Sequence, residues 1–443
     1  MRRRRTRTSA PSSTFVSLHI RNYRLFFAGQ IISTSGTWMQ TVAQGWLVLR
    51  LTRSGTDLGL ITAARFLPMM LFSPWGGLIA DRLDKRRILY VTQTLAGLLA
   101  LLLAALVADH VITLWMVAVI ALALGFVNVF DNPTRQSFIA EMVPEKNLGN
   151  AITLNSVTIN MARVIGPALA GVLIATVGIA PCFLANAVSF GAVLISLVMM
   201  RPRELYPVAR PTRQPGQVRE GLRYVRRTPE LLVPLIMITV VGTLAWEFQV
   251  SLPLMARFAF HGSAATYGTM LAFMGAGAVV GGLVTARRGR LSAVGLGRSS
   301  IGWGLAILAA SIAPNLPAEY GLLLLVGYGS ISFNSLAKTT LQLAAVPSMR
   351  GRVMALWSVA WLGSTPIGGP IVGWIGQSFG ARWSLVVGGL AAVAAGLLGY
   401  ASLKRIDQRA LASSSAGSGD IGPEPESSTE VPAAVQVATQ FEP

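Results

Sequence analysis

The chain has 443 residues, of which 53% are hydrophobic and only 12% charged, and its mean hydropathy is +0.57. Soluble domains of this length do not reach such a composition, which therefore excludes a soluble globular protein and predicts a polytopic membrane protein. The net charge of +19 would suit nucleic-acid binding, but its placement along the chain argues against that function.

Apolar runs of about 20 residues, the length of a membrane-crossing helix, recur along the whole chain. We therefore expect an all-α polytopic membrane protein whose even number of spans places both termini on one side. The twelve expected transmembrane helices lie near residues 23–49, 58–80, 88–108, 114–137, 151–177, 180–200, 231–255, 265–286, 298–313, 319–345, 353–378 and 382–403.

The basic residues divide unequally between the two sides of this topology. Most of the 37 lysines and arginines fall on the side of the termini, whereas the opposite side holds Arg50, Arg53, Arg257 and Arg382. Because loops rich in Lys and Arg stay in the cytoplasm, we expect both termini there, in a multi-pass protein of the cell (inner) membrane. The basic loops would face an anionic inner leaflet rather than nucleic acid.

The expected domains follow from these spans. A basic cytoplasmic N-terminus (1–22) precedes an N-terminal six-helix bundle (23–200) and a cytoplasmic linker (201–230) with a surface helix in "QVREGLRYVRRTPE". A C-terminal six-helix bundle (231–403) and a disordered cytoplasmic tail (404–443) follow. We interpret "MRRRRTRT" as a disordered topology determinant, rather than a lipid anchor or a binding arm, ahead of a first helix that is retained.

The two halves repeat at an offset of 203 residues. "VP" at 143–144 and "GP" at 166–167 match "VP" at 346–347 and "GP" at 369–370, and "FDNPTR" falls on "FNSLAK". Two similarly oriented six-helix halves are the parallel-repeat plan of secondary transporters, which hold substrate between the halves near the membrane midplane.

The loop after the second expected helix, "GGLIADRLDKRR", resembles the signature of the major facilitator superfamily through Gly77, Asp81, Arg82, Lys85 and Arg86. The corresponding loop of the second half has Ala286 where the signature has an acid. The resemblance implies the fold of that superfamily, with two six-helix bundles, and a cytoplasmic gate built from these charged side chains.

Three longer stretches, "RNYRLFFAGQIISTSGTWMQ", "DNPTRQSF" and "EGLRYVRRTPEL", resemble the branch of enterobactin-type siderophore exporters and macrolide-efflux proteins. This resemblance implies a proton-coupled exporter of bulky organic molecules. Many drug-exporting relatives have an acid in the first helix and an arginine early in the fourth, but 25–49 contains no acid and 114–134 no arginine. The coupling residues of those relatives therefore do not carry over.

The fifth expected helix contains "ARVIGPALAG", which resembles the Gly-Pro motif of the antiporters in that superfamily through Gly166, Pro167 and Gly171. Small residues at this spacing also let two helices approach closely. Packing and an antiporter signature explain the motif equally well, and they are compatible.

A polar stripe runs along the first expected helix, where three glutamines, a serine and a threonine recur three or four residues apart. Its members are Gln30, Ser33, Thr37, Gln40 and Gln44. Polar groups survive in lipid where they contact other helices or a water-filled cavity. Interhelical hydrogen bonding could account for them, but we favour the wall of a substrate cavity.

Charged residues inside the spans are functional candidates, since even insertion scales assign ~2.5–3.5 kcal/mol to Arg, Lys or Asp at a helix centre. Asp131, Arg135 and Lys338 lie near the expected cytoplasmic ends of their helices. We interpret them as an ion-pair cluster beneath the cytoplasmic gate, with Arg82 or Arg86 as further partners of Asp131, rather than as a substrate site.

Arg65, Arg163 and Glu247 lie deeper in their helices. Either the arginines bind an anionic group of the substrate and Glu247 carries the proton, or the three form permanent charge pairs that fix helix register. Glu247 is the first candidate for proton coupling because no Lys or Arg lies within four residues of it, and Asp131 is the second.

Other classes of function fit the sequence less well. The three histidines lie far apart, and no metal-spaced cluster, nucleophile elbow or P-loop is present, so we expect no enzyme, no cofactor and no metal. An importer or lipid translocator of the same fold, or a membrane receptor or scaffold, are the alternatives. We expect a monomer whose partners are a small-molecule substrate and protons.

Overall fold

A computed structural model describes residues 15–206, 217–287 and 293–417. The described part of the chain is helical throughout. The arginine-rich start of the chain, the linker prolines Pro207, Pro211 and Pro215, and the last part of the tail lie outside the described residues.

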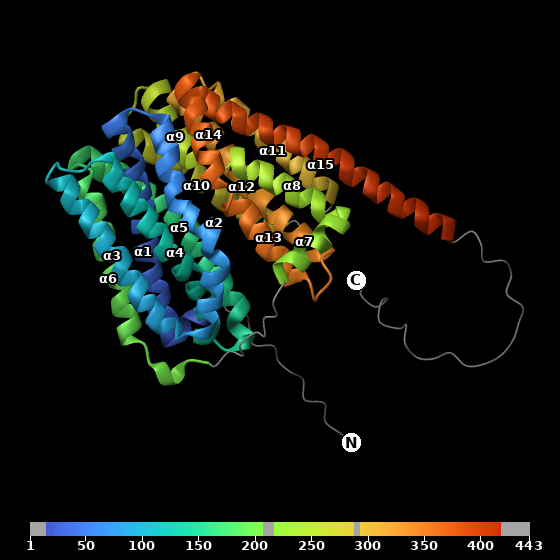
Figure 1. The fold of residues 1–443 in the computed structure, drawn as a ribbon, viewed down its shortest axis with the longest axis horizontal. Helices are drawn as coiled ribbons and strands as arrows, with labels where there is room; N and C mark the ends of the chain where they lie inside the picture. Colours follow the sequence, from blue (N-terminus) through green and yellow to red (C-terminus); the bar gives the residue numbers. More distant parts are fainter. Residues whose placement is uncertain (1–14, 207–216, 288–292, 418–443) are drawn as a thin grey trace, which may run out of the picture.

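The first group of helices packs into one bundle, coloured blue to green in Figure 1. This first bundle consists of α1 (Arg21–Thr52), α2 (Gly55–Arg82), α3 (Lys85–Ala108), α4 (Leu114–Met142), α5 (Glu145–Thr176) and α6 (Ala180–Met199). A short helix, η1 (Val16–His19), precedes the bundle.

The second group forms another bundle, coloured yellow-green to red in Figure 1. Its members are α8 (Pro229–Leu244), α9 (Phe248–Leu254), η3 (Met255–Ala259), α10 (Ala264–Arg287), α11 (Ala293–Ser311), α12 (Leu316–Ala344), α13 (Arg350–Leu362), α14 (Thr365–Ser378) and α15 (Ala381–Gly417). The connection contains η2 (Pro202–Glu204) and α7 (Gln217–Arg227), so the predicted linker helix is confirmed as a helix. It packs on α8 and α13 with Val225 fully buried.

Eight helical segments among the described residues are long and apolar enough to cross a membrane, which supports the predicted polytopic membrane protein. The count of twelve stays a prediction. The polar stripe lies on α1, and α1 is not one of the eight. The last helix was expected to end at residue 403, but α15 continues to Gly417. Lys404 and Arg405, just beyond the expected end, are good helix formers.

Two expected spans are broken rather than continuous. The seventh is interrupted at 245–247, between α8 and α9, and ends in a π-helical turn, η3. The eleventh is interrupted at 363–364, between α13 and α14. Pro366 accounts for the second break, because a proline near the start of a helix removes a backbone donor and disfavours helical geometry just before it.

We call the end of the bundles where α1 ends and α2 begins the distal end, and the opposite end the proximal end. At the distal end α2 and α14 cross at four glycines, Gly55, Gly59, Gly369 and Gly373, here called the glycine interface. A Cβ on Gly59 would lie 2.3 Å from the carbonyl oxygen of Gly369, and one on Gly373 would lie 2.2 Å from that of Gly55. Two GxxxG pairs therefore bring the two backbones into direct contact.

A second contact between the bundles joins α5 and α10. A Cβ on Gly268 would lie 2.4 Å from the carbonyl oxygen of Pro167, and one on Gly171 would lie 3.1 Å from the Cα of Ala265. Gly166 packs instead within its own bundle, where an added Cβ would meet the Ser35 carbonyl oxygen at 2.5 Å. Close packing thus uses all three residues of the Gly-Pro motif. Figure 1 shows the bundles meeting near α9, α10 and α14 and diverging toward α7 and α13.

We predict that Gly59→Ala weakens the distal contact, because its methyl group must displace the backbone of α14. The distance between spin labels placed on exposed residues of α2 and α14 should lengthen or broaden. Gly191→Ala on α6 is the matched control, since nothing lies within 4 Å of its added Cβ. An unchanged distance distribution in Gly59→Ala would contradict the assigned role of the glycine interface.

Candidate functional site

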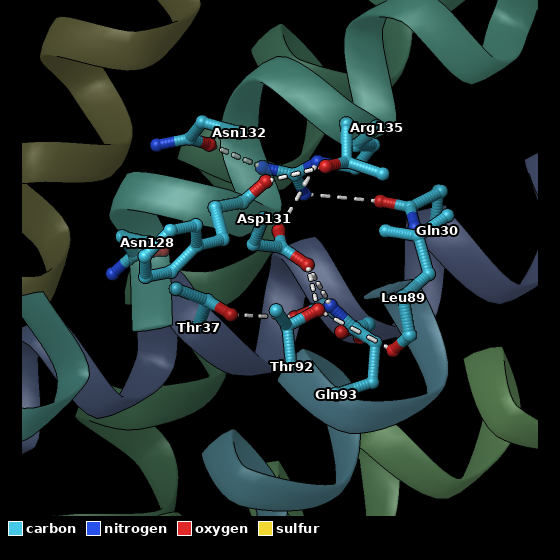
Figure 2. A network of polar contacts seen from close by, with 12 residues as sticks. Gln30, Thr37, Leu89, Thr92, Gln93, Asn128, Asp131, Asn132 and Arg135 are labelled. Atoms are coloured by element: carbon cyan, nitrogen blue, oxygen red, sulfur yellow. Dashed lines mark hydrogen bonds and ion pairs between the residues drawn. The ribbon is translucent and has the colours of Figure 1, made fainter. Parts of the chain in front are cut away.

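Asp131 on α4 is the centre of a polar network that joins three helices of the first bundle (Figure 2). One carboxylate oxygen accepts hydrogen bonds from Thr92 Oγ1 at 2.9 Å and from Gln93 Nε2 at 2.7 Å, both on α3. The other lies 3.6 Å from Nε of Arg135, one helical turn further along α4. With 4% of its surface exposed, Asp131 is a buried charge whose lone pairs are satisfied by the protein.

Arg135 extends the Asp131 network to the first helix. Its guanidinium donates to Oε1 of Gln30 on α1 at 3.1 Å and to Oδ1 of Asn132 at 2.7 Å. The network therefore connects α1, α3 and α4, which agrees with the predicted ion pair between Asp131 and Arg135.

The predicted partners of Asp131 in the signature loop lie elsewhere. Lys85 pairs with Glu141 at the end of α4, and Arg86 donates to the carbonyl oxygen of Leu197 near the end of α6 at 2.5 and 3.0 Å. Arg82 is exposed, and the side chain of Asp81 lies outside the described residues. Lys85 and Arg86 thus join helices within the first bundle, where cations favourably meet the carboxylate and carbonyl groups of helix C-termini.

Lys338 does not join the cluster in which sequence reasoning placed it. Its side chain is exposed, and its ammonium lies 5.5 Å from the centre of the Trp357 ring, a cation–π geometry within the second bundle. Among the described residues it forms no ion pair with Asp131. The expected single gate cluster is therefore two separate groups in this structure.

The polar stripe of α1 divides between several neighbours. Gln40 accepts a hydrogen bond from Nδ2 of Asn186 on α6 at 2.6 Å, and Gln30 accepts from Arg135. Thr37 donates to the backbone oxygen of Ser33 one turn earlier, and Ser33 is buried. Interhelical and local hydrogen bonds, the alternative to a cavity wall, thus account for the side chains of Gln30, Thr37 and Gln40.

Gln44, the last member of the stripe, lines a small cavity between α1, α2 and α9 that encloses about 20 Å³, room for roughly one water. Arg65 also lines it and donates to Oγ1 of Thr41 at 2.9 Å. Beside Arg65 lies Tyr267 of α10, fully buried, with no hydrogen-bond partner for its hydroxyl group among the described residues. Nothing in the local sequence distinguishes Tyr267, because the contact forms only when the two bundles meet.

Arg163 lies on α5 and faces α1. Its guanidinium carbon is 5.5 Å from the centre of the Trp38 ring on α1, and its Nε has no hydrogen-bond partner among the described residues. The described side chains include no carboxylate paired with Arg163 or Arg65. The expected alternative of permanent pairs between these arginines and Glu247 is therefore absent from this structure.

Glu247 lies in the break between α8 and α9 and is 2% exposed. Its carboxyl group is within hydrogen-bonding reach of the Thr365 side chain, in the first turn of α14, and Oε1 has no partner among the described residues. Gly368 provides the necessary space, since a Cβ there would lie 3.0 Å from Oε1. Gly369, the next residue, faces Gly59 across the glycine interface, so Glu247 lies directly behind the contact between the bundles.

An aromatic cluster includes the two residues that flank this acid in the chain, Trp246 and Phe248. Trp246 lies 4.6 Å from Trp361 and 6.0 Å from both Phe248 and Trp303, between ring centroids. Trp246 and Phe248 are the neighbours of Glu247 in the chain, whereas Trp303 and Trp361 come from α11 and α13 and were not expected from the sequence. The α13–α14 break was also missed, although Pro366 indicates it.

The chain also matches the model of a known protein family. The model of the transmembrane secretion effector family matches residues 12–431. The chain belongs to the major facilitator superfamily.

Several members of this superfamily are similar to the chain in sequence. The enterobactin exporter EntS of Citrobacter koseri is 26% identical over 381 residues, which are 85% of this chain and 90% of the relative. The multidrug efflux pump Tap of Mycobacterium bovis is 25% identical over 84% of this chain and 91% of its own length. The staphyloferrin A transporter of Staphylococcus aureus is 25% identical over 59% of this chain and 66% of the relative.

Solved structures share the fold at lower identity. A bacterial homologue of the lysosomal transporter Spinster, in an inward-facing and unoccupied conformation, superposes with a TM-score of 0.68 at 15% identity, covering 87% of this chain and 97% of that one. A bacterial homologue of ferroportin in an inward-facing state gives a TM-score of 0.66 at 16% identity, covering 87% of this chain and 98% of that one. At these identities the likeness shows the fold alone.

We predict that Asp131→Asn destabilises the first bundle, because Arg135 loses its ion pair and the two donors from α3 lose a charged acceptor. The loss should be about 1.5–3 kcal/mol per hydrogen bond to the charged group, seen as a lower midpoint of thermal unfolding in detergent. Thr153→Val, on the exposed face of α5, is the control because its hydroxyl bonds only within its own helix. Equal midpoints for both variants would contradict the network's role.

We predict that Gln40→Leu and Gln44→Leu differ in effect. Gln40→Leu removes the acceptor of Asn186 and should lower thermal stability by about 1–3 kcal/mol. Gln44→Leu changes only the lining of the small cavity and should alter transport selectivity at unchanged stability. Thermal unfolding midpoints measure the effect on stability, and a panel of efflux substrates measures the effect on selectivity. A stability loss in Gln44→Leu together with a selectivity change alone in Gln40→Leu would contradict this division of the stripe.

Proposed function

We propose that this chain is a secondary active transporter that exports bulky amphipathic organic compounds by proton antiport with alternating access. The observation that carries the proposal is the position of Glu247, a buried carboxyl group behind the glycine interface at which the two bundles meet. A transporter that alternates must separate and rejoin such a contact, so an acid beside it can couple protonation to movement.

The orientation follows from charge. The proximal end carries the basic loops, which supports its placement in the cytoplasm, and the distal end then faces outward. Contacts between the bundles gather at α2–α14 and α5–α10 toward the distal end, and the bundles diverge proximally (Figure 1). This arrangement supports an inward-facing state, in which substrate enters from the cytoplasm or the inner leaflet.

The two helix breaks supply the means of coupling. Broken helices at the level of a transporter's binding site place backbone and helix ends where ions and substrates bind. The first turn of α14, which contains Thr365, presents the positive end of its helix dipole to the Glu247 carboxyl group. With the glycine interface closed, Glu247 is buried and has no cationic partner among the described residues, so the neutral acid costs less there than a carboxylate.

A transport cycle follows from these positions. When the glycine interface opens outward, water reaches Glu247 and a proton from outside binds. Closure buries the neutral carboxyl group, as in the arrangement seen here. Substrate binding from the cytoplasmic side, next to the aromatic side chains around Trp246, then favours release of the proton inward.

The substrate class is proposed on two grounds. Trp246, the partly exposed member of the cluster with Trp303 and Trp361, offers stacking surface next to the acid in the chain. Arg163 on Trp38 offers a cation that lacks a carboxylate partner among the described residues. The similar proteins are named for enterobactin, staphyloferrin A and multiple drugs. A siderophore-like or drug-like compound, partly aromatic and partly polar, fits both.

We predict that Glu247→Gln, which imitates the neutral acid, abolishes uphill efflux but preserves ligand binding and downhill exchange. In proteoliposomes with an imposed pH gradient, accumulation of a siderophore or a cationic dye should fall about tenfold or more. A tenfold fall corresponds to a loss of ~1.4 kcal/mol of coupling free energy. Glu319→Gln on α12 is the matched control, since Glu319 is a buried acid in the interior of the second bundle. Full gradient-driven transport by a folded Glu247→Gln variant would rule out this coupling site.

A further inference from the structure

The distal end contains a second, larger cavity, which the proposed transport cycle does not use. It encloses about 390 Å³ and is lined from both bundles, by Trp46, Arg50, Arg53, Ile174 and Ala175 of the first and by Arg257, Ser263, Ala264 and Ala265 of the second. This volume is within the range of small-molecule binding sites.

The cavity gathers an uncommon set of charges. Only four basic residues fall on the distal side of the expected topology, and three of them, Arg50, Arg53 and Arg257, line it. The fourth, Arg382, donates to the backbone oxygens of Ser311 and Ala313 at 2.9 Å each and so caps the end of α11. Arg382 is thus held by backbone oxygens, whereas Arg50, Arg53 and Arg257, also at helix C-terminal ends, donate no side-chain hydrogen bond to a described residue.

None of these three arginines forms an ion pair with an acid among the described residues. Arg50 and Arg53 approach from α1 and Arg257 from η3, so like charges of the two bundles converge where the bundles close. Water weakens the repulsion because Arg50 and Arg53 are exposed, and an anion between the three charges would reduce it further. The start of α10, at Ala264 and Ala265, adds the positive end of a helix dipole, while the Ser263 N–H is already bonded to Oγ1 of Thr266 at 3.1 Å.

The aromatic lining defines the rest of the ligand. Trp46 forms part of the wall, and the guanidinium carbon of Arg257 lies 5.5 Å from the centre of its ring.

Arg53 ends α1 with a left-handed backbone, φ 54°, a conformation that glycine or asparagine adopts more readily. Keeping an arginine there favours a role for its side chain.

We propose that this distal cavity binds an oxyanion, a carboxylate or phosphate group, between the arginines of the two bundles. An arginine fork matches both groups, and Trp46 would contact an apolar part of the same molecule. The oxyanion could belong to a soluble compound outside the cell or to the headgroup of an outer-leaflet lipid. The assignment to the outer face rests on the proposed orientation, whereas binding itself does not.

The test measures binding of citrate and, separately, inorganic phosphate by titration calorimetry, with the full chain in phosphatidylcholine nanodiscs and no gradient. Arg50→Gln, Arg53→Gln and Arg257→Gln should each weaken citrate binding about tenfold or more, because each removes a charge-assisted hydrogen-bond donor. Arg24→Gln, an exposed arginine near the proximal start of α1, is the matched control and should bind as the parent does. Raising the salt concentration should weaken binding in the parent.

Two further arms make the result decisive. Arg50 and Arg53 are exposed, so unchanged unfolding midpoints in their variants would show that lost binding is not lost folding. Nanodiscs containing phosphatidylglycerol identify the source of the oxyanion. Citrate binding that is weaker there than in phosphatidylcholine nanodiscs indicates a lipid headgroup, and equal citrate binding indicates a soluble oxyanion. Citrate and phosphate binding that is absent in the parent, or unaffected by all three substitutions, would overturn the proposal. Failed efflux with intact citrate binding would count against the proposed transport cycle alone.

Discussion

Contact between two helix backbones without intervening side chains is the constraint on which the rest of this structure depends. Gly55 and Gly59 of α2 lie against Gly369 and Gly373 of α14, so the two bundles meet at van der Waals distance. A larger residue at any of these positions would separate the helices. Beside the glycines, Oε1 of Gln377 on α14 accepts hydrogen bonds from Ser54 Oγ at 2.7 Å and from the Thr56 N–H at 3.0 Å. A contact of close backbones and two hydrogen bonds suits a transporter that alternates between two arrangements.

The same contact determines the surroundings of Glu247. The acid lies in a helix break, faces the first turn of α14 and has Gly368 beside it, where a side chain would take its space. Closure of the glycine interface therefore removes water from an ionisable group. In the proposed cycle, burial of the neutral acid and closure of the bundles are one event, which is the physical basis of the coupling proposed for this chain.

Charges elsewhere serve different purposes at the two ends. Proximally, Lys85, Arg86 and Asp131 connect helices of one bundle and would move with it as a rigid body. Distally, Arg50 and Arg53 of one bundle approach Arg257 of the other, and separation of the bundles would divide the cavity that they share. The first group maintains a bundle, and the second responds to the distance between bundles.

The sequence by itself determined the membrane class, the family resemblance, most helix positions and the pairing of Asp131 with Arg135. These follow from apolar runs, from motifs and from side chains one turn apart on one helix, all of which are local. Only the tertiary structure decided that Gln40 bonds to Asn186, that Lys338 lies on Trp357, that Glu247 faces Thr365 and that three distal arginines share a cavity. The partners in each of these contacts lie on different helices, and helix rotation and approach depend on packing across the whole molecule, so no pattern within a single span could indicate them.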